Sequence, residues 1–260
     1  MCLLVLAWQA HPRYRLVVAA NRDEFHERPA APLARWPEPP GILAGRDLRA
    51  AGTWLGLDPA RRFGVVTNFR ELQERAPAAP SRGGLIPAYL GGAHGAREFC
   101  ARLAPAGTEY AGFNLLLADG GALWYCSNRA APFARELPPG VYGLSNELLD
   151  TPWPKLVRVK ARFREWLAEP DRAPAGLFTL LADRTQAPPE GAPLPAGGLP
   201  REWERILSAP FVVHPVYGTR CSTVLLLEPG GRVYLAERRF DSAGDGRGES
   251  EFRLNAGDWP

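Results

Sequence analysis

The cysteine at position 2 is the residue whose place in this sequence predicts the most specific chemistry. An initiator methionine is normally removed when the second residue is small, so we expect Cys2 to become the first residue of the mature protein. It then carries a thiol with a pKa of about 8.5 and an α-amine with a pKa of about 7.7–8.0. Because such an amine can take the proton of the thiol, the sequence predicts a nucleophile that needs no histidine as its base.

The first two expected strands determine which residues lie beside this cysteine. They cover Cys2 to Trp8 and Arg15 to Asn21 and are separated by a loop of about six residues. In an antiparallel pair across this loop, Trp8 faces Arg15. Cys2 then faces Asn21, and the polar run from Asn21 to Glu24 is expected beside the N-terminus. Burying such a run is costly unless its charges are paired or hydrated.

Arg22 and Asp23 are the candidates for assisting the cysteine. Arg22 would favour the thiolate electrostatically, and Asp23 would hold or orient the α-ammonium group. Whether Asp23 or Glu24 is the carboxylate that faces the nucleophile stays open. The alternative interpretation is that Arg22 and Asp23 form a structural ion pair that closes the hairpin.

Amide side chains at the ends of expected strands are candidates for binding the substrate. Attack on a carbonyl generates an oxyanion that needs preorganised donors, and we expect Asn21, Asn68 and Asn146 to supply amide groups. Asn68 and Asn146, like Asn114, can instead be turn formers whose amides satisfy the backbone. Arg220 opens an apolar strand and is either a charge of the site or an edge residue whose side chain extends to water.

Runs of β-branched and aromatic residues between turn formers predict strands in the first half and near the end of the chain. Asp58-Pro59 and Asp119-Gly120-Gly121 mark two hairpins. The Pro-rich stretch Thr185 to Pro200 predicts a surface loop, and Gly244 to Ser250 predicts a polar, mobile tip. The other expected strands are Thr53 to Leu57, Phe63 to Asn68, Phe113 to Ala118, Leu123 to Ser127, Arg220 to Leu227 and Arg232 to Arg239, and the expected helices are Ala96 to Leu103, Thr151 to Trp166, Ala175 to Asp183 and Glu202 to Leu207.

The order of strands, then helices, then strands predicts an α+β fold in a single domain over residues 1–260, with mainly antiparallel sheets and helices on their outer faces. The continuous apolar runs Leu3 to Leu6, Leu115 to Leu117 and Val224 to Leu227 are typical of strands covered on both faces. They favour two stacked sheets.

Composition argues against several classes of function. The net charge is +3 with both signs mixed along the chain, so we expect no nucleic-acid partner. The apolar start MCLLVLAW is too short for a signal peptide or a membrane span. Four widely spaced cysteines predict reduced thiols and a cytoplasmic location. The histidines are scattered and form no metal-binding motif, so no metal or other cofactor is expected.

An ordered set of short sequence blocks runs over essentially the whole chain. These blocks are Met1-Cys2, Asn21-Arg22-Asp23-Glu24, Gly52-Thr53-Trp54-Leu55-Gly56, Thr67-Asn68-Phe69-Arg70, Ser81-Arg82-Gly83, Gly112-Phe113-Asn114-Leu115, Leu144-Ser145-Asn146, Thr151-Pro152-Trp153-Pro154-Lys155 and Thr219-Arg220-Cys221-Ser222-Thr223. In them the sequence resembles the NRDE family, whose animal members are called transport and Golgi organisation proteins.

This resemblance implies a four-layer αββα fold of the N-terminal nucleophile class, similar to bile-salt hydrolases and penicillin V acylases. Those enzymes combine an N-terminal cysteine with an arginine and an aspartate after the first hairpin, a later asparagine and an arginine in a late strand. One departure is that those enzymes have Arg-Asn-x-Asp where this chain has Asn21-Arg22-Asp23. By position, the catalytic roles pass to Cys2, Arg22, Asp23, Asn146 and Arg220, with Asn68 as a second amide.

The expected function is therefore hydrolysis of a non-peptide C–N amide bond in a small molecule, through a thioester formed on Cys2. The resemblance also implies an alternative, because the animal members of the family are linked to haem trafficking and lipid metabolism. On that alternative, the same fold binds haem or an acyl lipid without turnover. The expected partners are thus a small-molecule amide, an acyl lipid or haem.

Overall fold

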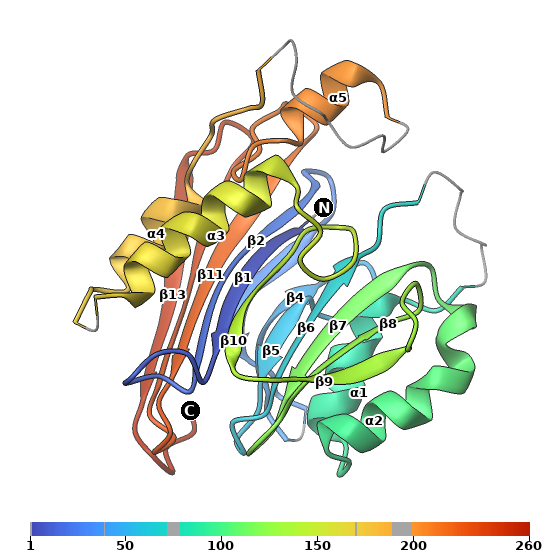
Figure 1. The fold of residues 1–260 in the computed structure, drawn as a ribbon, viewed down its shortest axis with the longest axis vertical. Coiled ribbons are helices and arrows are strands. Elements are labelled where there is room, and N and C mark those ends of the chain that lie inside the picture. The colour runs from blue at the N-terminus through green and yellow to red at the C-terminus, as the bar shows by residue number, and fades with distance from the viewer. Residues whose placement is uncertain (1, 39, 72–78, 170, 189–198) are drawn as a thin grey trace. The chain divides into compact units, whose positions relative to one another are not determined.

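A computed structural model describes residues 2–38, 40–71, 79–169, 171–188 and 199–260 (Figure 1). The chain forms two compact units. Unit 1 consists of Met1–Glu27, Pro139–Ser145 and Leu149–Ala256, and unit 2 consists of Arg28–Pro138, Asn146–Leu148 and Gly257–Pro260. The expectation of one domain over residues 1–260 stays a prediction, because compactness alone does not decide whether a unit folds independently.

Unit 1 contains a six-stranded antiparallel sheet in the order β10-β1-β2-β11-β12-β13. Strand β2 lies between β1 and β11, so a strand from the start of the chain pairs with one near its end (Figure 1). The strands are β1 (Cys2–Trp8), β2 (Leu16–Phe25), β10 (Gly140–Leu144), β11 (Tyr217–Leu227), β12 (Val233–Phe240) and β13 (Gly246–Leu254), and the helices of this unit are α3 (Pro154–Leu167), α4 (Ala175–Leu181) and α5 (Arg201–Ile206).

Helices α3 and α4 cover one face of this sheet. Leu3 of β1 and the β2 residues Val17 and Ala19 are fully buried in one cluster with Val159 and Phe163 of α3. Successive residues of a strand point to opposite faces. The odd-numbered positions of β2 therefore face the helices, and the even-numbered positions face away from them.

Unit 2 contains a seven-stranded antiparallel sheet whose strands follow one another in chain order, from β3 to β9. Helices α1 and α2 come between β6 and β7 in the sequence, and Ile86 of α1 and Cys100 of α2 are fully buried with Leu115 and Leu117 of β7. The elements are β3 (Ala30–Arg35), β4 (Leu43–Asp47), β5 (Leu55–Leu57), β6 (Phe63–Asn68), η1 (Arg82–Gly84), α1 (Leu85–Gly91), α2 (Ala96–Leu103), η2 (Ala104–Glu109), β7 (Phe113–Ala118), β8 (Leu123–Ser127) and β9 (Ala134–Leu137).

The structure confirms the α+β class, the antiparallel sheets and both predicted hairpins, which join β5 to β6 and β7 to β8. The prediction of a mobile tip over Gly244 to Ser250 is wrong, because β13 begins at Gly246 and pairs with β12 along its length. As an edge strand with mostly exposed side chains, β13 has the polar sequence that suggested a loop. Of the loop expected over Thr185 to Pro200, residues 189–198 lie outside the described part of the chain.

The register of the first hairpin differs from the prediction by one residue. Cys2 pairs with Arg22, and Asn21 pairs with Leu3. The loop between β1 and β2 is one residue longer than expected and begins at Gln9, whose φ is +48° and whose N–H donates to the Arg15 carbonyl at 2.7 Å. A shift of one residue moves every side chain to the other face of its strand. Arg22, rather than Asn21, is therefore the backbone partner of Cys2.

Candidate active site

Cys2 lies at the start of β1, in a row of backbone partners that crosses three strands. Arg22 of β2 pairs with Cys2 on one side and with Cys221 of β11 on the other. Adjacent strands are about 4.8 Å apart, so Arg22 is an immediate neighbour of both cysteine positions. Its side chain is 6% exposed, and its Nη2 lies 3.8 Å from Oε2 of Glu24. The even position of Arg22 in β2 directs its buried positive charge away from α3 and α4.

A β-bulge places a second arginine next to this row. In the pairing of β11 with β2, Thr219 is opposite Asp23 and Cys221 is opposite Arg22, which leaves Arg220 as the extra residue between them. Its Nη1 donates to the carbonyls of Phe25 and His26, at 2.8 and 3.1 Å. Burial and the nearby charge of Arg22 both lower the pKa of Arg220. Bulges commonly redirect a side chain beside an active site, and this one brings two guanidinium groups together.

Asp23 lies on the opposite face of β2 from Arg22, the face that α3 and α4 cover. It is 2% exposed, and its Oδ1 accepts a hydrogen bond from the Thr219 hydroxyl at 2.7 Å. Burial raises the pKa of Asp23 above its ordinary value, while the positive charge of Lys155 acts to lower it. These two sequence neighbours thus place a guanidinium group and a carboxyl group on opposite faces of the strand.

Asn21 also faces the helices, and its amide group is used within unit 1. Its Nδ2 donates to the carbonyls of Leu181 and Pro210, both at 2.9 Å, and its Oδ1 accepts from the Ser222 hydroxyl at 2.6 Å. These bonds tie β2 to β11, to the end of α4 and to the segment before β11. The role of Asn21 in binding substrate stays a prediction, and it would require the amide to leave one of these partners.

Asn68 and Asn146, the two later amides, are joined to each other in unit 2. The Nδ2 of Asn146 donates to the Asn68 carbonyl at 3.0 Å, and the Asn146 carbonyl accepts from the N–H of Arg70 at 2.7 Å. Asn146 is 3% exposed and adopts a φ of +59°, in the left-handed region that asparagine tolerates better than most residues. The two asparagines therefore form one rigid pair at the end of β6.

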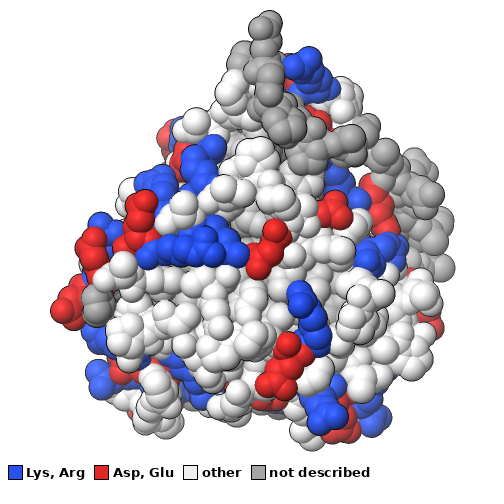
Figure 2. Space-filling view, in the orientation of Figure 1, with Lys and Arg blue, Asp and Glu red and all other residues white. Residues whose placement is uncertain are grey.

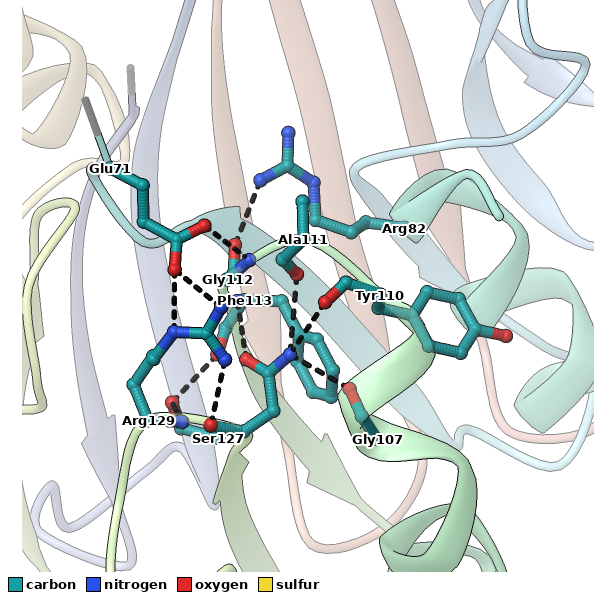
Figure 3. Close-up of polar contacts among 10 residues, drawn as sticks. Glu71, Arg82, Gly107, Tyr110, Ala111, Gly112, Phe113, Ser127 and Arg129 are labelled. Atoms are coloured by element: carbon teal, nitrogen blue, oxygen red, sulfur yellow. Dashed lines mark hydrogen bonds and ion pairs between the residues drawn. The ribbon is translucent and has the colours of Figure 1, made fainter. Parts of the chain in front are cut away.

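A cluster of polar side chains fixes the strand that pairs with Asn68. Figure 3 shows the Glu71 carboxylate between Gly112 and Arg129: it accepts from the Gly112 N–H at 2.9 Å and also from the Arg129 guanidinium. Arg82 donates to the Gly112 carbonyl at 2.8 Å, on the other side of the same residue. The Gly112 carbonyl also accepts from the N–H of Phe69. Charged groups thus hold the end of β6 against the start of β7.

The predicted site residues fall into two groups. The first lies at adjacent positions of β1, β2 and β11 in unit 1, and the second lies around the end of β6 in unit 2. The first group is Cys2, Asn21, Arg22, Asp23 and Arg220, and the second group is Asn68 and Asn146.

Sequence reasoning missed Thr219, Ser222 and Lys155 as site residues. Thr219 and Ser222 bond Asp23 and Asn21, respectively, and their polar character inside an apolar strand was a usable signal. Lys155 is 2% exposed although it stands in the first turn of α3. A lysine there is ordinarily hydrated, so the sequence held no sign of its burial.

Within the described residues, no group of His, Cys, Asp and Glu side chains could hold a metal ion. The same part of the chain contains no helix that is long and apolar enough to cross a membrane. Acidic and basic side chains are interspersed on the face seen in Figure 2, in keeping with the mixed charges of the sequence.

Comparison with known proteins decides the family. A family model described as Transport and Golgi organisation 2 matches residues 1–242. The chain belongs to this family. The Transport and Golgi organization 2 homolog of Mus musculus is 33% identical over 279 residues, which cover 98% of this chain and 100% of the mouse protein. The Transport and Golgi organization protein 2 homolog of Bos taurus is 36% identical, with 98% of this chain and 100% of the bovine protein covered. The resemblance to the NRDE family is therefore confirmed.

A solved structure shares the fold of this Transport and Golgi organisation 2 family member. It is the C2A mutant of conjugated bile acid hydrolase from Clostridium perfringens, with a TM-score of 0.52, coverage of 98% of this chain and 92% of that chain, and 7% sequence identity. An identity this low establishes the fold alone. The expected similarity in fold to bile-salt hydrolases is thus confirmed, while the activity is a separate question.

Proposed function

We propose that this protein is an N-terminal cysteine hydrolase that cleaves the amide bond of a small molecule. The observation that carries the proposal is the pairing of Cys2, at the start of β1, with the buried Arg22. The fold shared with a conjugated bile acid hydrolase supports it. A buried guanidinium beside a cysteine favours the thiolate, which is the reactive form.

The reaction begins once Met1 has been removed, and Met1 itself lies outside the described residues. The α-amine of Cys2 takes the thiol proton, and the sulfur attacks the amide carbonyl to give a tetrahedral oxyanion. Collapse breaks the C–N bond, and the α-ammonium returns its proton to the leaving amine. A thioester remains on Cys2. Water, deprotonated by the same amine, hydrolyses it and releases a carboxylic acid and the free thiol.

The other residues have proposed roles around this step. Asp23 orients the α-amine, and Arg22 stabilises the thiolate. Arg220 adds a second positive charge that binds an acidic group of the substrate. Its position in the bulge beside Arg22 supports this role. Asn146 and Asn68 are proposed as amide donors to the oxyanion. Asn21 stays a candidate for binding substrate.

The test is covalent labelling followed by intact mass measurement. We expect the mature protein to lack Met1 and to gain one acyl group from an electrophilic amide or β-lactam probe. Cys2→Ala removes the nucleophile and should lower the labelling rate by on the order of 10⁴-fold or more. Cys221→Ala is the matched control, because Cys221 pairs with the same Arg22 and its loss should leave labelling intact. A mature protein that retains Met1, or undiminished labelling of Cys2→Ala, would refute the proposal.

A second function, binding of haem or an acyl lipid without turnover, is favoured by exposed apolar side chains near this site. Phe25, the last residue of β2, is 51% exposed, and Val216, just before β11, is 53% exposed. The Phe25 ring also meets the Tyr217 ring edge-on, with centroids 5.1 Å apart. Titration with haem and with an acyl-CoA separates the two functions. The binding function is supported if the ligand binds saturably, if Cys2→Ala binds it equally well and if the wild type is not acylated. The absence of saturable binding excludes this function.

A further inference from the structure

A buried lysine stands at the start of the helix that covers the N-terminal strands. Lys155 is the second residue of α3, and only 2% of its surface is exposed. Removing an ammonium group from water is costly unless an opposite charge accompanies it. A carboxylate partner is therefore expected on the face of the sheet below α3.

The first turn of α3 lies directly over the strands next to the N-terminus. A Cβ atom on Gly143 of β10 would lie only 2.7 Å from Cδ1 of Leu156, the residue after Lys155. Strand β10 pairs with β1, with Leu144 opposite Leu4. Lys155 thus stands near the end of the sheet at which β1 begins.

Asp23 is the carboxylate at that end of the sheet. It follows Arg22, the partner of Cys2, and it sits on the helix-covered face with 2% of its surface exposed. From β11, the Thr219 hydroxyl donates to its Oδ1. Burial raises the pKa of Asp23, and the positive charges of Lys155 and Arg22 each act to lower it, with Lys155 the stronger of the two. Lys155 and Asp23 are therefore two buried ionisable groups of opposite kind on the helix-covered side of the sheet, and the charge of Lys155 acts to lower the pKa of Asp23.

We propose that Lys155 is a positioning residue for the N-terminal nucleophile, because its ammonium group keeps the buried Asp23 carboxylate ionised to hold the α-amine of Cys2. This inference rests on the proposed function, since the amine in question is the one that the loss of Met1 exposes. An ionised Asp23 attracts the α-ammonium and orients it toward the sulfur, whereas a neutral Asp23 provides no such charge. Lys155 makes and breaks no bond itself.

The experiment measures how the rate of Cys2 labelling depends on pH, from about pH 5 to 9. Lys155→Met removes the charge at similar volume, so Asp23 takes up a proton at higher pH than in the wild type. We expect this variant to be labelled at least tenfold more slowly near pH 6. In its plot of labelling rate against pH, the fall in rate on the acidic side should begin closer to neutral pH. Lys155→Arg keeps the charge and should restore the wild-type profile. A Lys155→Met profile that matches the wild type would overturn the inference.

The double variant Asp23→Asn with Lys155→Met guards against misfolding, because it removes both buried charges and leaves neither unpaired. We expect the double variant to fold and to be labelled slowly. Its labelling rate should not show the fall at acidic pH that Lys155→Met displays. Labelling at the wild-type rate in the double variant would overturn the role of the pair. If the wild type itself is not labelled, the proposed function fails, and if the wild type is labelled while every variant matches it, only this inference fails.

Discussion

At the scale of single residues, the loop of the first hairpin is held by a histidine that must stay neutral. The Nδ1 of His11 accepts the backbone N–H groups of Arg13 and Tyr14, at 3.1 and 3.2 Å. Its ring stacks on Tyr14 and Trp166, with centroids 4.9 and 5.9 Å apart. A nitrogen that accepts two bonds carries no proton, so the ring proton is on Nε2. Burial, together with the charge of Arg13, lowers the pKa of His11.

We therefore expect the protein to lose stability as the pH falls below about 6.5, the ordinary pKa of histidine. In the unfolded state His11 takes up its proton at a higher pH than in the folded state. Between the two pKa values the unfolded state binds more protons, so the free energy of unfolding falls on acidification. Below the folded pKa this contribution changes no further. Urea unfolding at pH 8, 7, 6 and 5 measures how the free energy of unfolding changes with pH.

His11→Asn is the control for this effect. An asparagine carbonyl can accept the same two backbone N–H groups in an Asx-turn, and it does not titrate. The variant should therefore show a smaller loss of stability between pH 7 and pH 5. An unchanged slope would mean that other groups cause the acid sensitivity.

The roles of Arg22, Asp23 and Lys155 differ in how far a sequence can predict them. The position of Cys2 after Met1, together with the expected first hairpin, nominated Arg22 and Asp23. Which of the two shares a face with Cys2 was not predictable, because it depends on a register that one extra loop residue changes. The burial of Lys155 follows from the packing of α3 on β10, which no local sequence pattern encodes.

At the scale of elements, Gly52 allows two separate segments of unit 2 to touch through their backbones. A Cβ atom on Gly52 would lie 2.4 Å from the carbonyl carbon of Gly83. The N–H of Thr53, the next residue, donates to the Gly83 carbonyl at 3.0 Å. This contact joins the segment before β5 to η1, and it explains why position 52 carries glycine.

We expect Gly52→Ala to lower the free energy of unfolding by about 1–3 kcal/mol, the usual cost of overpacking a buried contact. The atoms in the way belong to the backbone, so no side chain can rotate to make room. Gly84→Ala is the matched control, since a Cβ there meets nothing within 4 Å, and its effect should be close to zero or slightly stabilising. Urea denaturation measures both. Equal effects of the two substitutions would contradict this account.

Strands marked by long apolar runs were predictable, whereas several shorter or more exposed elements were not. The predicted bounds of β1, β6, β7 and β8 agree with the structure, because their apolar runs mark them clearly. The predicted bounds of α2 agree as well, although only Ala96, Cys100 and Leu103 of this helix are buried. The edge strand β13 was missed for the opposite reason. The bulge at Arg220 was also beyond prediction, since it exists only in the pairing of β11 with the distant β2.

At the scale of the whole molecule, the two units are interleaved in the sequence. The sheet of unit 1 takes β1 and β2 from the start of the chain and its other strands from the second half, whereas the sheet of unit 2 uses consecutive strands. The order of elements predicted the α+β class, but neighbours so distant in sequence could not be deduced from it. Pairing distant strands requires closure of long loops before it yields any stabilisation.

This topology predicts the behaviour of a chain divided between residues 138 and 139. The fragment 139–260 retains β10, β11, β12 and β13 but lacks β1 and β2, which lie between β10 and β11 in the sheet. We expect it to remain unfolded or to aggregate when expressed alone, because β11 then exposes an apolar edge along its whole length. Circular dichroism measures the secondary structure of this fragment, and urea titration shows whether it unfolds cooperatively.

Co-expression with the fragment 1–138 tests whether the missing strand pairs are the cause. That fragment supplies β1 for β10 and β2 for β11, so the two pieces should purify together and unfold cooperatively. Because β2 also carries Arg22 and Asp23, only the reassembled protein should regain labelling at Cys2, provided that the proposed function holds. Cooperative unfolding of 139–260 on its own would show that the central strands are dispensable, and the dependence of the site on this topology would have to be abandoned.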